Sequence, residues 1–228
     1  IFVVSDHALY RLDADENGTP AVTWREEYDR GTRKKPGQFS QGSGTTPTLI
    51  GRDYVAITDN SEPRMNVLVY KRQRSVAGNR LVCRVPVFEE GASAPENSLI
   101  AFGNSIIVEN NYGYPRAVHF IGKLSTPGMA RIDVSPDGQC ETLWNADIIV
   151  PSVVSKYSTK SGMAYTYAKD RAGWYFTGLS GATGKTVFSK KVGEDELKFN
   201  NHYSGIAIGP DGSAYVGTLG GIIRFGRN

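Results

Sequence analysis

The sequence predicts an all-β protein built from repeated four-stranded antiparallel units, and three observations support this prediction. Apolar residues occur in short runs bounded by Gly, Asn, Asp and Pro, which is typical of strands. The 228 residues include 26 Gly, 12 Tyr and 9 Phe, a composition that favours tight turns and strands. The third observation is an internal repeat with a period of about fifty residues, which indicates a repeat architecture.

A hydrophobic strand that ends in polar residues marks each repeat and recurs at intervals of 50 to 58 residues. Its copies are expected at residues 2–7, 55–60, 106–111, 164–169 and 214–219. A strand precedes each copy except the first, at residues 46–50, 97–101, 152–154 and 203–207. A third strand follows at 9–13, 67–70, 130–133, 174–177 and 222–225, and a fourth at 21–24, 81–84, 141–144 and 186–189.

Four antiparallel strands per unit, repeated radially, predict a β-propeller with blades at residues 1–40, 41–91, 92–147, 148–196 and 197–228. A β-sandwich is the alternative fold, but a sandwich requires no period of about fifty residues. The first unit lacks its innermost strand and the last lacks its outermost, so about four and a half blades are present. We expect one propeller domain over residues 1–228, incomplete at its N-terminus. It would belong to a ring of about six to eight blades that further polypeptide completes, in cis or as a second chain.

Residues 174–188 read Trp-Tyr-Phe-Thr-Gly-Leu-Ser-Gly-Ala-Thr-Gly-Lys-Thr-Val-Phe and resemble the repeat of quinoprotein-dehydrogenase-like propellers. Leu12-Asp13, Ile132-Asp133, Trp24 and Trp144 fit the same frame more loosely. Residues 42–49 and 108–114 are similar to uncharacterised secreted actinobacterial proteins of this propeller type. The resemblance implies the fold and little about function, because one fold hosts many activities.

The same resemblance argues against a quinone cofactor. Family enzymes that bind the quinone use a vicinal disulfide or a stacking Trp, together with a metal held by Glu, Asn and Asp. This sequence contains no vicinal Cys pair, and Trp24 and Trp144 are expected in outermost strands, far from the axis.

Polar residues gather where the strands near the axis begin and end. The start of one strand and the end of its antiparallel neighbour lie at the same edge of a sheet, so these residues are expected at the mouth of the central channel. They are Asp6, His7, Asp59, Asn60, Asn97, Glu109, Asn110, Asn111, Asn200, Asn201 and His202. Tyr112, Tyr114 and Tyr203 flank this mouth, where aromatic rings can stack on a ligand.

Three interpretations of these residues stay open. Carboxylate and amide oxygens suit calcium, and a similar Glu/Asn/Asp set holds calcium in lactonase-type propellers. The candidate metal or ligand residues are Asp6, Asp59, Asn60, Asn97, Glu109, Asn110, Asn111 and Asn201. A histidine beside a carboxylate could instead perform acid–base catalysis, with His202, His7 and Glu109 as candidates. In the third interpretation, the Asn and Asp side chains only bond the backbone of their own loops.

We therefore expect the mouth to bind a small ligand or a metal ion such as calcium. The alternatives are a metal-dependent hydrolase or lyase and a non-catalytic protein-interaction scaffold. The chain has 26 basic and 23 acidic residues, a balance that does not indicate a nucleic-acid partner, and its basic stretch at residues 30–35 is expected to be a solvated loop. No apolar run has the length of a membrane span.

The two cysteines, Cys83 and Cys140, fall in the outermost strands of neighbouring units. Such strands diverge, whereas a disulfide requires Cα atoms within about 7 Å. A secreted propeller with only two cysteines nevertheless favours their oxidation. We expect a Cys83–Cys140 disulfide that stabilises the fold at a distance from the mouth, and with it a secreted or extracellular protein.

Overall fold

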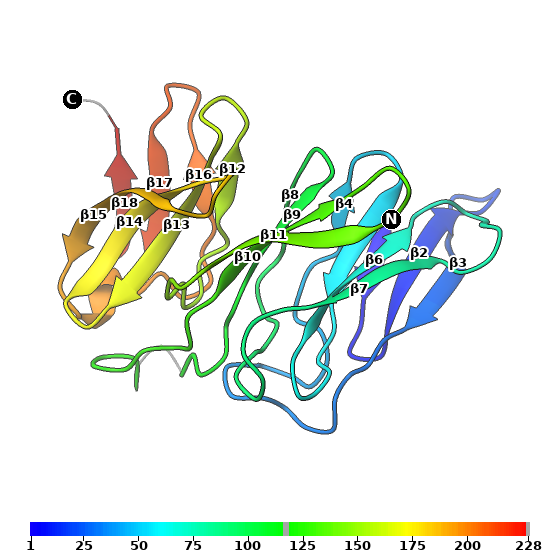
Figure 1. Ribbon diagram of the computed structural model, residues 1–228, viewed down its shortest axis with the longest axis horizontal. Coiled ribbons are helices and arrows are strands. Elements are labelled where there is room, and N and C mark those ends of the chain that lie inside the picture. Colours follow the sequence, from blue (N-terminus) through cyan, green and yellow to red (C-terminus); the bar gives the residue numbers. More distant parts are fainter. Residues whose placement is uncertain (116–118, 227–228) are drawn as a thin grey trace.

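The computed structural model describes residues 1–115 and 119–226, which form five antiparallel sheets (Figure 1). Each sheet consists of consecutive strands, and the sheets follow one another in chain order from the blue to the red end of the ribbon. The strands are β1 (Phe2–Val4), β2 (Ala8–Ala14) and β3 (Pro20–Glu27); β4 (Thr48–Ile50), β5 (Tyr54–Thr58), β6 (Asn66–Lys71) and β7 (Leu81–Pro86); β8 (Ile100–Phe102), β9 (Ser105–Glu109), β10 (Met129–Val134) and β11 (Cys140–Ala146); β12 (Lys156–Ser158), β13 (Met163–Asp170), β14 (Gly173–Ser180) and β15 (Thr186–Gly193); and β16 (Ile206–Ile208), β17 (Ala214–Thr218) and β18 (Gly221–Phe225).

This architecture confirms the predicted all-β propeller fold. The first sheet has the order β1-β2-β3 and lacks an inner strand, and the last has the order β16-β17-β18 and lacks an outer one. The three sheets between them have four strands each. A 3-10 helix, η2 (Leu197–Phe199), lies between β15 and β16.

One predicted strand is wrong. Residues 152–154 were expected to open the fourth unit, but β12 begins at Lys156. The segment before it belongs to a linker, because its polar side chains bond other loops. Ser152 Oγ donates a hydrogen bond to Asn201 Oδ1 over 3.0 Å.

The apolar core is divided among the four contacts between neighbouring sheets. Alternate residues of one strand face opposite neighbours, because side chains of a strand alternate between the two faces of its sheet. Val55 and Ile57 pack with Leu9 of the first sheet, whereas Ala56 packs with Ile106 of the third. The inner strands are therefore buried on both faces, which explains why they appear in the sequence as uninterrupted apolar runs.

A repeated Arg-x-Asp pattern links each of two sheets to the next. Arg131 donates to Asp133 in its own strand and, through Nη1, to the carbonyl oxygen of Gly181 over 2.7 Å in the following sheet. Arg11 makes the corresponding bonds to Asp13 and to the carbonyl oxygen of Arg72. The Asp of the Leu-Asp and Ile-Asp dipeptides therefore orients an arginine that connects two blades.

The outer-strand tryptophan Trp144 packs on the turn of the next sheet. Its Nε1 donates to the carbonyl oxygen of Gly181 over 2.9 Å. A Cβ atom at Gly184 would lie 2.6 Å from the Trp144 ring, and Gly184 has a φ of 69°. The glycine of the Thr-Gly-Lys sequence is therefore required both for the turn and for the close approach of the ring.

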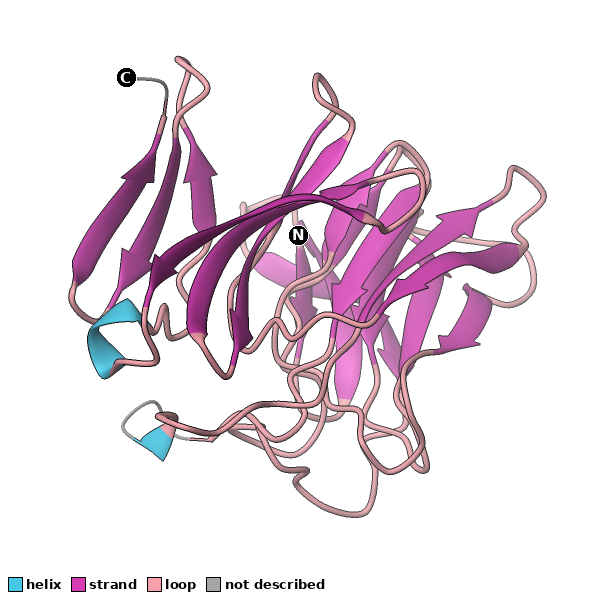
Figure 2. Ribbon diagram, turned by 60° about the vertical axis from the view of Figure 1, so that its left-hand side comes forward, coloured by secondary structure: helices cyan, strands magenta, loops and turns pink. Residues whose placement is uncertain are grey.

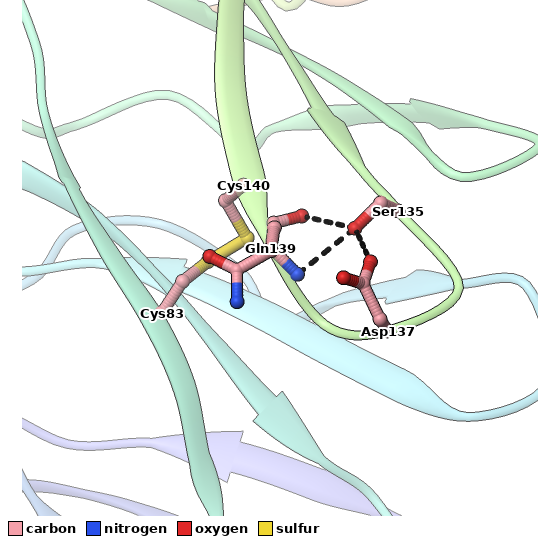
Figure 3. The surroundings of a disulfide bond; sticks show 5 residues. All are labelled: Cys83, Ser135, Asp137, Gln139 and Cys140. Atoms are coloured by element: carbon pink, nitrogen blue, oxygen red, sulfur yellow. Dashed lines mark hydrogen bonds between the residues drawn. A yellow bond between two sulfur atoms is a disulfide. The ribbon is translucent and has the colours of Figure 1, made fainter.

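A disulfide joins Cys83 of β7 to Cys140 of β11 and so connects the second and third sheets at their outer strands (Figure 3). The two Cα atoms are 6.2 Å apart, within the range that a disulfide can bridge. Cys140 follows directly on the β10–β11 turn, in which the Ser135 hydroxyl accepts a hydrogen bond from the backbone N–H of Gln139. This turn brings β11 close enough to β7 for the expected cysteine pair to form.

The longer loops collect on one side of the molecule, which we call the loop face (Figure 2). It consists of the connections β1–β2, β3–β4, β5–β6, β7–β8, β9–β10, β11–β12, β13–β14, β15–β16 and β17–β18. The remaining hairpin connections within the sheets, of which β6–β7 spans residues 72–80, form the opposite side. None of the helices in the described part of the chain has the length and apolar character needed to cross a membrane.

Candidate functional site

The polar residues expected at the channel mouth all lie on the loop face, in several different connections. Asp6 and His7 lie in the β1–β2 turn, and Asp59 and Asn60 follow β5. Asn97 precedes β8, Glu109 ends β9, and Asn110 and Asn111 follow it; Asn200, Asn201 and His202 lie between β15 and β16. Apart from the exposed residues Asp6, His7 and His202, all of these side chains are buried.

The buried asparagines hold the loops of neighbouring blades together. Asn60 Nδ2 donates to the carbonyl oxygens of Arg30 and Arg33. Asn111 accepts from two backbone N–H groups of the β7–β8 loop, and its Nδ2 donates to the carbonyl oxygen of Pro151. Asn110 bonds backbone groups on both sides in the same way, at Ala92, Ala94, Tyr112 and Pro127. Their amide groups are therefore engaged mainly with the backbone of other loops, whereas the third interpretation expects bonds within their own loops.

The two buried carboxylates of the set have neutral hydrogen-bond partners. Asp59 accepts from the backbone and side-chain N–H groups of Asn66 and from Ser61. Glu109 accepts from Asn97 Nδ2 over 2.9 Å and from the hydroxyl of Ser155. Burial raises the pKa of Asp59, and it raises the pKa of Glu109 to about 7.

The candidates for a metal site and for histidine catalysis differ in their surroundings. Within residues 1–115 and 119–226, no three His, Cys, Asp or Glu side chains are grouped so that they could hold a metal ion. His7 contacts Asp6 through Nδ1 at 2.6 Å and Arg30 through Nε2 at 2.9 Å, in an exposed cluster at the edge of the first sheet. The hydrogen bond from His7 is the largest influence on Asp6 and lowers its pKa. All of these candidates, including the pair of His7 and Asp6, stay predictions.

A cavity of about 820 Å³ opens on the loop face where three distant connections meet. The β3–β4 linker crosses to the β15–β16 linker, where Tyr203 Oη donates to the carbonyl oxygen of Gly37 over 3.3 Å. The β9–β10 loop lies between them. The residues that line the cavity are Arg33, Lys34, Lys35, Pro36, Gly37, Gln38, Phe39, Tyr114, Pro115, His202 and Tyr203.

Gly37 allows the β3–β4 linker to lie low over the β9–β10 loop. It has a φ of 103°, and a Cβ atom at this position would lie 2.2 Å from the carbonyl oxygen of Asn111. The neighbouring carbonyl oxygen of Pro36 accepts a hydrogen bond from the backbone N–H of Gly113 over 2.9 Å. Close backbone contact, which only glycine permits here, therefore sets the position of one wall of the cavity.

Phe39, Tyr114 and Tyr203, one from each of the three connections, form an aromatic wall of the cavity. The ring centroid of Tyr203 lies 5.0 Å from that of Phe39 and 5.2 Å from that of Tyr114. Tyr114 Oη is 3.1 Å from His202 Nδ1 and donates to Asn200 Oδ1. His202 and Tyr203 have φ angles of 40° and 66°, which is uncommon for residues with side chains and concentrates at functional sites.

Three consecutive basic residues of the β3–β4 linker line the cavity. Arg33 pairs with Glu62, and the hydrogen bonds from Thr32 and Arg33 lower the Glu62 pKa to about 2. Lys35 is buried and donates to the carbonyl oxygen of Ser61, and burial lowers its pKa. Lys34 is exposed and forms no salt bridge within the described residues, although its charge acts on Glu96.

Glu96 lies behind the aromatic wall. Its Oε1 accepts a hydrogen bond from the backbone N–H of Phe39 over 2.8 Å. Burial raises its pKa to about 7, against the opposing influence of the Phe39 hydrogen bond and of Lys34. A carboxyl group that titrates near neutrality thus holds the loop that carries Phe39.

The sequence indicated part of this cavity and missed the rest. Tyr114, Tyr203 and His202 were expected near the mouth, whereas the basic stretch was interpreted as solvated surface. Phe39 and Glu96 were not singled out. Residues 33–39 connect two blades on the same face as the three expected residues. This shared face could have indicated that the linker lies near them.

No protein-family model matches the chain. An uncharacterized protein from Archaeoglobus fulgidus is 27% identical to it over 252 aligned positions, covering 98% of this chain and 49% of that protein. The chain therefore spans about half the length of this relative.

Solved structures share the fold of this chain. BamB from Moraxella catarrhalis matches 100% of the chain with 58% of its own length, at a TM-score of 0.59 and 12% identity. A 6-phosphogluconolactonase-like protein from Bacteroides fragilis matches 97% of the chain with 61% of its length, at a TM-score of 0.64 and 13% identity. At these identities the similarity concerns the fold alone, and it agrees with the arrangement of the sheets: the chain has a β-propeller fold.

Proposed function

We propose that this chain is a ligand-binding part of a β-propeller and that a small molecule binds in the cavity on the loop face. The aromatic wall carries the proposal. Phe39 is 68% exposed, although it packs on Tyr203, so one of its faces is available to a ligand. Aromatic rings held in place by a scaffold contribute large contact area at a low entropic cost.

The backbone geometry supports the same site. Two successive residues with side chains hold left-handed conformations at the wall, which costs roughly 1–3 kcal/mol for each residue and persists only where surrounding contacts impose it. The cavity volume also falls within the range of about 300–1,000 Å³ that is usual for small-molecule sites.

Binding of fragments to the wild type and to Phe39→Ala tests this proposal. We expect ring-bearing fragments that give saturation-transfer NMR signals with the wild type to lose affinity about tenfold in the variant, because a stacking partner is removed. Val187→Ala is the matched control, because Val187 is an exposed apolar residue on the outer strand β15. Fragments that bind both variants as they bind the wild type would contradict the proposal.

We further propose that another polypeptide segment completes the ring, in cis or as a second chain, and that the protein is secreted. The first and last sheets have three strands each and leave Val3 and Ile222 exposed, which favours a partner at these edges. The disulfide favours an oxidising compartment.

Sedimentation of the 228-residue chain tests ring completion. We expect concentration-dependent association that Val3→Lys together with Ile222→Lys abolishes, because lysine at an edge prevents pairing. The wild type sedimenting as a monomer at every concentration would contradict this expectation.

A further inference from the structure

We propose that the cavity binds a small anion that carries a planar ring, and that Glu96 takes up a proton when this anion binds. The inference rests on the proposed function, because it concerns the ligand of the same cavity. It follows from the charges that line the opening, from the aromatic wall and from the position of Glu96 behind that wall.

The charges select an anion. Every charged side chain that lines the cavity is basic: Arg33, Lys34 and Lys35. The salt bridge to Glu62 partly neutralises Arg33, and the ammonium group of Lys35 points to the carbonyl oxygen of Ser61. Lys34 therefore remains as the cation whose charge is available at the opening, and an anion can pair with it there.

The aromatic wall selects a ring. Phe39, Tyr114 and Tyr203 present tilted and edge-on ring pairs rather than one closed stack, so a face of Phe39 stays uncovered. A planar ring of the ligand can pack on this face while its anionic group reaches Lys34, five positions earlier in the same linker.

Protonation of Glu96 makes binding of the anion depend on pH. Its carboxylate accepts the Phe39 N–H, and the titratable groups that face it are Lys34 from the β3–β4 linker and Tyr203 from the β15–β16 linker. At neutral pH the wild type divides between both forms of Glu96, because burial raises its pKa to about 7. A bound anion occupies Lys34 and adds negative charge nearby, so it disfavours the Glu96 carboxylate further.

The sign of the pH dependence follows. The complex binds more protons than the free protein between pH 6 and 8, so affinity for the anion rises as pH falls through this range. Glutamine at position 96 keeps an oxygen for the Phe39 N–H and never carries charge. Glu96→Gln should therefore bind the anion at pH 8 as tightly as the wild type does at pH 6.

Two fluorescent probes with the same rings test the proposal. The first, 8-anilinonaphthalene-1-sulfonate, is an anion across this pH range, and the second, N-phenyl-1-naphthylamine, is neutral. We expect the sulfonate to bind the wild type roughly fivefold more tightly at pH 6 than at pH 8, and the neutral probe to bind equally at both. Phe39→Ala should weaken both probes, which assigns their signal to the cavity.

Single substitutions separate the contribution of Lys34 to anion binding from the contributions of His202 and Glu96 to its pH dependence. We expect Lys34→Gln to weaken the sulfonate about fivefold without affecting the neutral probe, whereas Lys160→Gln, in the distant β12–β13 turn, changes neither. Histidine also changes charge between pH 5 and 8, and His202 lines the cavity. His202→Asn should keep the pH dependence, because asparagine tolerates a positive φ and leaves Glu96 in place.

The outcomes distinguish this inference from the proposed function. Equal affinities for the two probes, or an unchanged sulfonate affinity in Lys34→Gln, would disprove the proposal that the ligand is an anion. A pH dependence that survives Glu96→Gln or disappears in His202→Asn would overturn the role of Glu96. In either case the cavity would still be a binding site. Probe signals that are unchanged in Phe39→Ala would instead contradict the proposed function itself.

Discussion

Replacing both cysteines by serine is expected to lower the free energy of unfolding by about 4 kcal/mol, because the disulfide closes a loop with a sequence separation of 57 residues. The bond restricts the unfolded chain, and it connects the second and third sheets at their outer strands, β7 and β11. Urea unfolding of wild type and Cys83→Ser/Cys140→Ser, monitored by tryptophan fluorescence, measures the difference.

Reduction provides the matched control for this prediction. Wild type in dithiothreitol should unfold at the urea concentration of the double serine variant, and the variant should not respond to the reductant. Two thiols that react in denatured, non-reduced protein would show that the bond is absent and would also weaken the proposed secretion.

Glu109→Gln is expected to stabilise the protein at pH 8 by up to about 3 kcal/mol and to have little effect near pH 4.5. The pKa of Glu109 is raised from 4.5 to about 7 by burial, so the folded state binds its proton more tightly than the unfolded state does. The stability that this proton contributes is complete below pH 4.5 and is lost as pH rises towards 7. Glutamine remains neutral and avoids this loss.

The local hydrogen bonds can accommodate the substitution. The Gln oxygen can accept from Asn97 Nδ2, while its amide donates to Ser155 Oγ, which lies 2.8 Å from the hydroxyl of Thr166. Thermal unfolding of wild type, Glu109→Gln and the exposed control Glu16→Gln between pH 5 and 8 tests the prediction. A stability difference that stays constant over this range would disprove the buried charge as its cause.

The sequence predicted the sheets because their signal is local. Residues 55–57 and 106–108 are apolar runs followed by polar residues, and a strand buried between two neighbouring sheets is expected to show such a continuous apolar run. Residues 152–154 look alike in sequence but lie in a linker, since the bonds that hold Ser152 come from Asn201, 49 residues away. A short apolar run alone does not show whether the segment pairs in a sheet or is held by a distant residue.

The candidate site was only partly predictable for the same reason. The ends of the inner strands placed Asn60, Asn111 and Glu109 on one face, but their hydrogen-bond partners belong largely to other linkers, which no local pattern specifies. The cavity depends on Phe39 and Tyr203, whose rings meet although they are far apart in sequence. Sequence alone could identify the aromatic and basic residues separately, but not that the fold brings them together.

The hydrogen bond between Tyr203 and the carbonyl oxygen of Gly37 has a mechanical consequence. The two residues are 166 positions apart and belong to linkers that flank the second, third and fourth sheets. This hydrogen bond links the two linkers across the curved row of blades. Any outward bending of the row must therefore stretch or break it. A ligand in the proposed site would contact both linkers, so its binding would also resist this bending.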